Sequence, residues 1–365
     1  MVKQSLPKPS LEHLHRLTDD TGLFQHAKFT IPLRSEGYTT DDNTRALIVA
    51  TKHYALYRKP ETLQLIDRYL AFVLHSHNDN PSSLSLRRAG GTVRNFMDFD
   101  RTWHKAEPVH DAIGRVIWAF GAVLAQPPSE IYVPIAQERI DIAMPLIKKQ
   151  YPRGMAYSIL GLAGYLKQFP PSTLRSEGQA DADDVKNCMV TAADLIMSRF
   201  EKNMRPGWPW FENILTYDNA MLPCALFTAG ISLHNKKYIE IAKKICDFVL
   251  ESTFTGSHFS FVGCQGWFPR GGKKAQFDQQ PIEAAGTILM LDAGYKATKD
   301  KKYLMLRQKA FNWFLGENDL GIPLYDSKSK GCGDGLGAEG ISLNQGAEST
   351  ISFLLGLLTM CEGKR

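Results

Sequence analysis

Apolar residues recur along the chain in six long runs that carry small residues at helical spacing and few charges. Each run opens with a polar residue after a loop, and successive openings are 69, 42, 65, 62 and 65 residues apart. The openings are Asp42, Asp111, Arg153, Asp218, Gln280 and Gln345. Because these runs are apolar on nearly every side, they predict helices that are buried all round.

Segments with one apolar and one polar face lie between these runs. They predict five outer helices, at Glu61–His75, Ile131–Lys148, Asp183–Phe200, Lys237–Leu250 and Lys302–Leu315. A sixth helix at Ser10–Thr18 is expected to close the ring from the other end of the chain. A repeat of about 60 residues fits one helical hairpin with its loop.

Six buried and six amphipathic helices predict an all-α fold, an (α/α)6 toroid formed by residues 1–365 as a single domain. An open α-solenoid is the alternative, but its period is usually a tighter ~34–47 residues with short loops. Strands are expected only as short pieces in loops, for example at 258–262.

Composition and charge exclude several classes of function. Apolar residues make up 44% and charged residues 22%, as in a globular protein. The net charge of +5 comes from 43 basic and 38 acidic residues that are mixed along the chain, so no nucleic-acid partner is expected. No apolar run approaches the ~20 residues of a membrane span, and the N-terminus has no hydrophobic signal region. A cytoplasmic protein without a membrane partner is expected.

Motifs for metals, cofactors and nucleophiles are missing from the sequence. The six cysteines and the histidines lack zinc-site spacing, so neither a metal nor a cofactor is expected. Residues Gly335–Gly340 match Gly-x-Gly-x-x-Gly, but they follow no strand and open no βαβ unit, so a turn-rich loop is predicted. No nucleophile elbow is found.

The loops before the apolar runs concentrate acids, arginines, amides and aromatic residues. Parallel inner helices would bring these loops to one rim, where helix N-termini favour carboxylates. Aromatic rings that stack on sugars, interleaved with groups that bind hydroxyls, predict a carbohydrate site. The candidate substrate-binding residues are Tyr38, Asp42, Arg45, Asp100, Arg101, Trp103, His110, Arg115, Trp208, Trp210, Trp267, Gln279, Gln280, Tyr325, Gln345 and Glu348. Helix capping by Asp41 and core packing of Trp208 and Trp210 are the structural alternatives.

Four acids beside aromatic residues are the catalytic candidates: Glu212, Asp111, Asp218 and Asp278. Inverting glycoside hydrolysis needs a protonated and an ionised carboxyl group ~6.5–9.5 Å apart. The aromatic residues around Glu212 favour its protonated form and the role of general acid. Arg115 lies one turn after Asp111 and favours an ionised base there, with Asp218 as the alternative base.

Several segments also resemble a bacterial family. They are GYTTDDNTRAL (37–47), NFMDFDRTW (95–103), GR-x-x-WA-x-G (114–121), W-x-WFEN-x-LTYDNA-x-LP (208–223), GW…FDQQP-x-EA (266–284) and NQGAEST (344–350). The resemblance covers residues 11 to 358. Members of this uncharacterised family are usually labelled glycosidase-related or, by association with neighbouring domains, glycosyltransferase. It resembles the (α/α)6 superfamily of glycoside hydrolases, sugar epimerases and polysaccharide lyases.

One position departs from the pattern expected of that family. An acidic pair is expected just before the GR motif, whereas this chain has Val109, His110 and Asp111. A histidine in place of a carboxylate argues against a two-acid mechanism centred on this loop.

The leading functional hypothesis is an inverting glycoside hydrolase that acts on a mannose- or glucose-type oligosaccharide. A sugar isomerase or epimerase is the second, because His26, His104 and His110 could serve as bases. A non-catalytic glycan-binding partner of a glycosyltransferase is the third. The sequence leaves the linkage, the use of phosphate in place of water, and the oligomeric state open.

Overall fold

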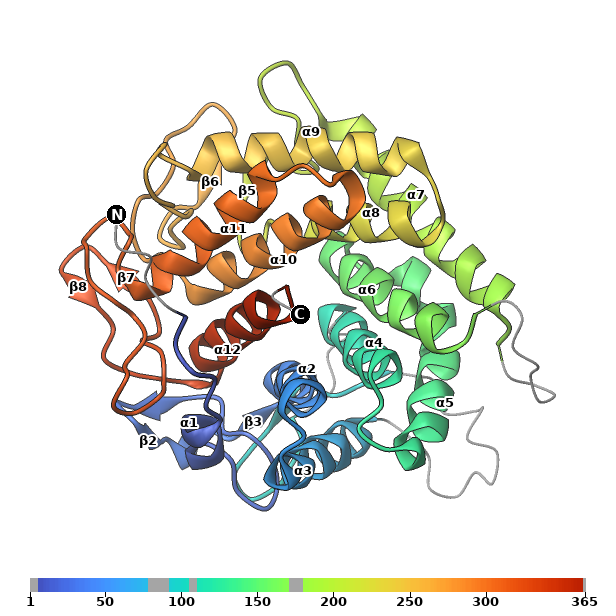
Figure 1. Ribbon diagram of the computed structural model, residues 1–365, viewed down its shortest axis with the longest axis vertical. Helices are drawn as coiled ribbons and strands as arrows, with labels where there is room; N and C mark the ends of the chain where they lie inside the picture. Colours follow the sequence, from blue (N-terminus) through green and yellow to red (C-terminus); the bar gives the residue numbers. More distant parts are fainter. Residues whose placement is uncertain (1–5, 78–91, 105–109, 171–179, 364–365) are drawn as a thin grey trace.

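A computed structural model describes residues 6–77, 92–104, 110–170 and 180–363. Within these residues, six inner helices surround a common axis, which Figure 1 views end on. They are α2 (Thr40–Tyr57), α4 (His110–Ala125), α6 (Pro152–Gln168), α8 (Met221–Ser232), α10 (Pro281–Thr298) and α12 (Ala347–Glu362). Each inner helix contacts the next, and α12 contacts α2, so the ring is closed.

Six further helices lie outside this ring. They are α1 (Glu12–Arg16), α3 (Pro60–Ser76), α5 (Val133–Ala143), α7 (Ala182–Asn203), α9 (Lys236–Thr253) and α11 (Lys302–Asn312). Each of the outer helices α3, α5, α7, α9 and α11 contacts the inner helix that precedes it in sequence. The outer helix α1 contacts α12. This alternation confirms the predicted (α/α)6 toroid.

The outer helices differ from the predicted ranges mainly at their ends. The helix predicted at 131–148 is interrupted, because Pro145 cannot donate a backbone hydrogen bond, and the chain continues as a 3-10 turn over Met144–Lys149. The helix α1 is shorter than the predicted Ser10–Thr18. Part of its buried face is Leu14, which belongs to the main core.

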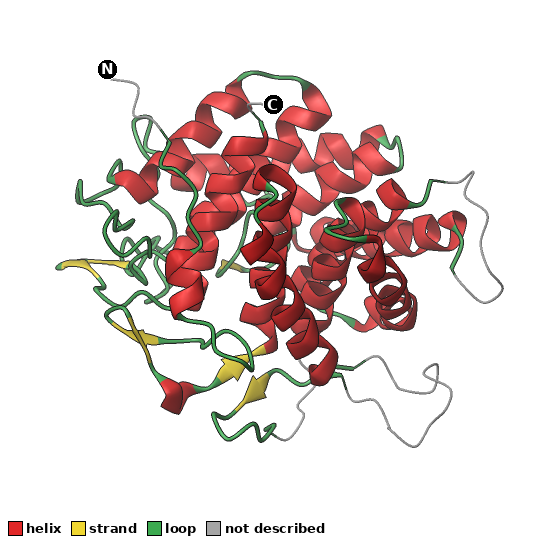
Figure 2. Ribbon diagram, turned by 60° about the horizontal axis from the view of Figure 1, so that its bottom comes forward, coloured by secondary structure: helices red, strands yellow, loops and turns green. Residues whose placement is uncertain are grey.

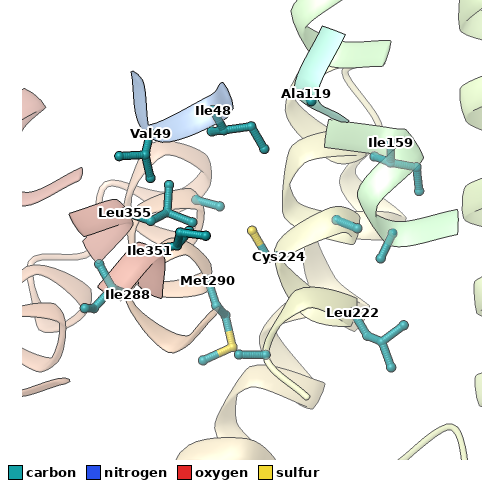
Figure 3. Close-up of a cluster of buried hydrophobic side chains, with 14 of the residues drawn as sticks. Ile48, Val49, Ala119, Ile159, Leu222, Cys224, Ile288, Met290, Ile351 and Leu355 are labelled. Carbon is teal, nitrogen blue, oxygen red and sulfur yellow. The ribbon is translucent and has the colours of Figure 1, made fainter. Parts of the chain in front are cut away.

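The core contains apolar side chains from all six inner helices and from the inward faces of the outer ones. Figure 3 shows part of it, with Ile48, Ala119 and Ile159 from the first three inner helices and Leu222, Ile288 and Ile351 from the others. These side chains are buried, as the apolar runs predict.

The contact between α4 and α6 is made by glycines. A Cβ atom at Gly121 would lie 2.2 Å from the carbonyl oxygen of Gly161, and one at Gly161 would lie 2.2 Å from that of Ile117. Gly114 and Gly164 face the opposite helix at similarly short range. The two backbones can approach this closely only without side chains, which explains the small residues in these runs.

The strands of the described residues form four antiparallel two-stranded pairs in the loops before inner helices (Figure 2). They are β1 (Ala27–Lys28) with β2 (Ile31–Pro32), β3 (Tyr38–Thr39) with β4 (Phe96–Met97), β5 (Ile214–Leu215) with β6 (Phe268–Pro269), and β7 (Leu336–Gly337) with β8 (Gly340–Ile341). The segment 258–262, expected as a β piece, contains one isolated bridge, between Phe259 and Phe254.

No helix in the described part of the chain combines the length and apolar character needed to cross a membrane.

Candidate functional site

A cavity of about 310 Å³ lies where the N-terminal ends of α2, α10 and α12 meet the β3–β4 pair. We call it the rim cavity. Its wall is mostly polar and consists of Gln25, His26, Thr39, Asp41, Asp42, Arg45, Asn95, Phe96, Gln280, Asp334, Gly346, Glu348 and Ser349. Of the predicted substrate-binding residues, Asp42, Arg45, Gln280 and Glu348 therefore meet in one cavity.

One nitrogen of Arg45 joins three carboxylates in this cavity. The Nη2 atom donates to Oδ2 of Asp41 at 2.7 Å, to Oδ1 of Asp42 at 2.8 Å and to Oε2 of Glu348 at 3.2 Å. Arg45 and Asp42 are buried, whereas the side chains of Asp41 and Glu348 are 26% and 41% exposed. Arg45 and Asp42 therefore form the buried inner part of the cluster, and the carboxylates of Asp41 and Glu348 reach solvent.

The local sequence of α2 explains why these groups converge. Thr39 caps the helix, because its hydroxyl accepts from the backbone N–H of Asp42 and donates to the Asp42 carboxyl group at 2.7 Å. Asp41 and Asp42 lie in the first turn, where the helix dipole favours negative charge. Arg45 follows one turn later on the same face.

The two adjacent aspartates have pKa values shifted in opposite directions. Burial raises the pKa of Asp42 to about 6; the charge of Arg45 opposes this shift and the negative charge of Asp41 adds to it. Burial also acts on Asp41, but the charges of Arg115 and Arg45 outweigh it and lower the pKa of that carboxyl group. Neighbouring carboxyl groups whose pKa values are shifted apart are typical of acid–base catalysis.

A buried chain of polar groups leads from Asp41 into the ring. Arg115 forms an ion pair with Asp41, and its Nη2 atom donates to the hydroxyl oxygen of Tyr157 at 2.9 Å. The Tyr157 hydroxyl donates to Oδ2 of Asp218 at 2.5 Å. Burial raises the pKa of Asp218. The predicted residues Arg115 and Asp218 thus lie behind the rim cavity and not in its wall.

Asp218 does not begin the fourth inner helix, contrary to the sequence prediction. Its φ is +47°, a left-handed conformation, and α8 starts at Met221. Glu283 holds this turn, because its carboxyl group accepts from the backbone N–H of Asp218 and, at 3.2 Å, from Nδ2 of Asn219. Gly286 leaves room for the Asp218 carboxyl group, since a Cβ atom at this position would lie 2.6 Å from Oδ1 of Asp218.

Glu283 is expected to make the stability of the protein depend on pH. Burial and the charge of Asp218 raise its pKa from 4.5 to about 8. Between these two values the folded protein binds a proton that the unfolded chain releases, so the free energy of unfolding falls as pH rises. We expect the free energy of unfolding in urea to fall less between pH 5 and pH 8 for Glu283→Gln than for the wild type. An equal dependence of the free energy of unfolding on pH in the two proteins would contradict the raised pKa of Glu283.

A second polar cluster lies at the starts of α4 and α6 and in the loop before α8. The Tyr217 hydroxyl donates to Oδ2 of Asp111 at 2.5 Å, and Nε of Arg153 donates to the carbonyl oxygen of Tyr217 at 2.6 Å. Arg153 also pairs with Glu212 at 3.1 Å. Glu212 therefore has a cation beside it, which the aromatic residues around it in the sequence do not indicate.

The fourth catalytic candidate, Asp278, lies in a different cavity. That cavity has a volume of about 570 Å³ and adjoins the β7–β8 pair. Gln280 contributes to both cavities.

The tryptophans of the loop before α8 pack in the core. Trp208 and Trp210 are 5% and 0% exposed, and both lie against Phe248. Their indole N–H groups donate to the carbonyl oxygens of Glu212 and Ile214. Both tryptophans therefore pack in the core, the alternative given for them above, and neither lies in the wall of the rim cavity.

Tyr38 and Trp103 also belong to a packed cluster. Tyr38 is buried and its hydroxyl donates to Asp19 at 2.6 Å. Trp103 lies against Phe72 and His75. Neither ring contributes to the wall of the rim cavity.

Two predicted amides are engaged within the loops. Gln279 donates to Asp319 at 2.6 Å and accepts from the Trp313 indole at 3.1 Å. Gln345 accepts from the Ser329 hydroxyl at 2.6 Å. Both amides are buried and hold loop segments together.

Four other predicted residues, Tyr325, Asp100, Arg101 and Trp267, are not in the wall of the rim cavity. Tyr325 stacks on Phe353. Asp100 accepts from a backbone N–H, Arg101 pairs with Asp20 on the surface, and Trp267 is half-buried. His110 begins α4, but its side chain is outside the described residues.

Several residues of the site were not selected from the sequence. The sequence leaves Asp41 open between a helix cap and a site residue, and the adjacent acid and Arg45 are the signals for the second. Tyr157 and Arg153 lie in an apolar run, where an isolated polar side chain is the signal for them. Asp334 accepts from the backbone N–H of Gly346 at 2.7 Å and fixes the start of α12.

No cluster of three or more histidine, cysteine, aspartate or glutamate side chains in the described ranges has the geometry of a metal site.

No protein-family model matches this chain, and a search of curated proteins finds no match. Solved structures do match over nearly the whole length. Cellobiose 2-epimerase from Bacillus thermoamylovorans has a TM-score of 0.68 and 11% identity, over 95% of each chain. The chain has the fold of the (α/α)6-toroid enzymes. At such low identity the match establishes the fold alone.

Glycoside hydrolases are found among the same matches. A family 76 α-mannanase from Bacteroides thetaiotaomicron has a TM-score of 0.63 and 11% identity, over 97% of this chain and 94% of that one. An α-1,6-mannanase of Salegentibacter has a TM-score of 0.58 and 10% identity, over 96% of each. The latter is an inactive variant, with asparagine replacing two adjacent aspartates, in complex with α-1,6-mannotriose.

Proposed function

We propose that this protein is a carbohydrate-active enzyme, a glycoside hydrolase that cleaves an oligosaccharide bound in the rim cavity. The observation that carries the proposal is the convergence of Asp41, Asp42 and Glu348 on one nitrogen of Arg45, with opposite pKa shifts in the adjacent aspartates. Glycoside hydrolysis needs a protonated and an ionised carboxyl group beside the bond that breaks.

Asp42 is the general acid of this mechanism, because burial keeps it protonated at a pH where an exposed aspartate is ionised. It gives its proton to the glycosidic oxygen as the bond to the anomeric carbon breaks. Glu348, the most exposed of the three, accepts a proton from the attacking water. Asp41 stays ionised and stabilises the positive charge that develops on the sugar ring.

The wall of the rim cavity offers groups that hold a sugar. Phe96 is 45% exposed and presents a ring on which a pyranose can stack. Asn95 Oδ1 accepts from the backbone N–H of Asp41 at 3.1 Å, which leaves its Nδ2 group to donate to a sugar hydroxyl. The Gln280 amide can donate to and accept from hydroxyl groups.

The comparisons support a glycan substrate and a role for adjacent aspartates. Two of the matched structures are mannanases, and one of them was made inactive by changing two adjacent aspartates. A mannose-type oligosaccharide is therefore the first substrate to test. Inversion at the anomeric carbon stays a prediction, and the spacing of the acids argues against it, because the oxygens of Asp42 and Glu348 that share the Arg45 nitrogen are at most about 6 Å apart, below the ~6.5–9.5 Å of inverting enzymes.

Two alternatives have specific support. The epimerases and the D-mannose isomerase among the matches, together with His26 in the wall of the rim cavity, favour a sugar isomerase or epimerase. Within a hydrolase, Glu212 with Asp111 is the second candidate pair, since Tyr217 and Arg153 join these two acids in one network. Asp218 is the alternative base for this pair, and it accepts from the Tyr157 hydroxyl.

The test is incubation of the purified protein with manno- and gluco-oligosaccharides, with and without phosphate. Products are separated by chromatography, and proton NMR identifies the anomer formed first. We expect shorter sugars with new reducing ends in the absence of phosphate. An epimer of unchanged length, a sugar phosphate, or binding without turnover would overturn the hydrolase.

The pH profile provides an independent check on Asp42. Its proton is present below a pH of about 6 and lost above it. We therefore expect kcat/KM to fall about tenfold per pH unit on the alkaline side of this value. A profile that stays flat from pH 5 to 8 would exclude Asp42 as the acid.

A further inference from the structure

The cavity of about 570 Å³ beside the β7–β8 pair adjoins the rim cavity. Gln280 and Asp334 contribute to the walls of both. We call the larger one the hairpin cavity, and its wall consists of Cys264, Asp278, Gln280, Asp334, Gly335, Gly337, Ala338, Glu339, Gly340, Ile341 and Ser342. A chain bound at Asp41 and Asp42 can continue past Gln280 into this second space.

The β7–β8 hairpin is fixed to the start of α10. The backbone N–H of Gln279 donates to the carbonyl oxygen of Leu336 at 3.0 Å, and that of Leu336 donates back at 2.9 Å. Asp334 donates its backbone N–H to the carbonyl oxygen of Asn344 at 2.9 Å. One wall of the hairpin cavity is thus a positioned backbone.

The glycines of this hairpin form the motif that the sequence analysis rejects as a dinucleotide site. The φ of Gly340 is +135°, which side chains rarely permit, and a Cβ atom at Gly337 would lie 3.0 Å from Oδ1 of Asp278. The motif therefore makes a tight hairpin and leaves Asp278 half-buried beside it.

The chemistry of this wall selects the kind of ligand. Its ionisable side chains are Asp278, Asp334, Glu339 and Cys264, and none of the lining residues is a lysine, arginine or histidine. Carboxylates accept hydrogen bonds from hydroxyl groups and repel anions. The hydroxyl of Ser342, the amide of Gln280 and the glycine backbone add neutral donors and acceptors.

We propose that the hairpin cavity is a further sugar subsite and that the substrate is an uncharged glycan of at least three units. Two units flank the bond that is cleaved in the rim cavity, and a third lies against the hairpin. This inference rests on the proposed hydrolase function. It also implies that chains carrying uronate or sulfate groups at the third unit are poor substrates.

The test compares α-linked manno-oligosaccharides of two and four units. We expect kcat/KM to be about tenfold or more higher for the tetrasaccharide, the effect of one or two added hydrogen bonds to the third unit. Ser342→Trp fills the hairpin cavity and should remove most of this preference. Leu343→Trp is the matched control, because Leu343 is exposed and outside the wall, and it should keep the preference.

Binding measurements keep the two proposals separable. Calorimetry with the wild-type protein should show tighter binding of the tetrasaccharide than of the disaccharide, and Ser342→Trp should reduce this difference even if neither sugar is cleaved. Ala338→Trp, at the hairpin tip, replaces Ser342→Trp if that variant does not fold. Equal affinity and equal turnover for the two lengths, or equal losses in the variant and its control, would overturn the subsite. Turnover that is absent despite length-dependent binding would overturn the hydrolase alone.

Discussion

Asp42→Asn is expected to lower kcat on the cleaved oligosaccharide by about 10²–10⁴-fold, the contribution of a general acid. Asparagine keeps the shape of the side chain: its carbonyl oxygen can still accept from Arg45, and its amide N–H can donate to the Thr39 hydroxyl oxygen, the two groups that hold Asp42 in the structure. It has no acidic proton, so the leaving sugar must depart without protonation. Steady-state kinetics on purified protein measures the change.

Glu212→Gln is the matched comparison, because Glu212 is also a carboxylate paired with an arginine. If the rim cavity is catalytic, this variant should retain most of its turnover. Both variants should unfold at temperatures close to that of the wild type. A large loss in Glu212→Gln with little change in Asp42→Asn would transfer the acid role to the cluster at α4 and α6.

Gly161→Ala is expected to lower the free energy of unfolding by about 3 kcal/mol, the upper end of the usual cost of overpacking. The added methyl group would lie 2.2 Å from a backbone oxygen of α4. That oxygen cannot rotate away as a side chain would, so α4 and α6 must separate. Urea unfolding monitored by circular dichroism measures the effect.

Gly294→Ala is the control for this variant, since Gly294 also lies within an inner helix. Its new methyl group would lie 3.3 Å from the ring of Phe227, an adjustable side chain. Alanine also favours helix by up to about 1 kcal/mol, so the stability should change little or rise. Equal destabilisation in both variants would show that the α4–α6 contact is not special.

The arrangement of helices could be predicted because burial leaves a periodic record in the sequence. Helices surrounded on all sides need apolar residues all round, and their partners need one polar face. The predicted start of α8 is wrong for a local reason: Asp218 takes a left-handed turn that directs its carboxyl group to Tyr157. In the sequence, a polar residue before an apolar run looks the same whether it begins the helix or lies in the turn that precedes it.

The candidate site was predictable in its location but less so in its members. Asp42, Arg45 and Glu348 converge because helix starts share one rim. Composition does not reveal that the Gln279 amide is occupied by Asp319 and Trp313 within the loops. Polar residues in such loops either face a ligand or hold the loop, and their partners, distant in sequence, decide which.

The contact that closes the ring, between α12 and α2, joins the last inner helix to the first. Arg45 and Glu348, which meet across it, are 303 residues apart in sequence. During synthesis the last carboxylate of the cluster leaves the ribosome only after nearly all other helices, so a chain shortened before Ala347 lacks both the closing helix and Glu348. Contacts of such long range also slow folding. The proposed activity is therefore expected to appear only once α12 has been made, and chains that stop before this helix should be inert towards glycans.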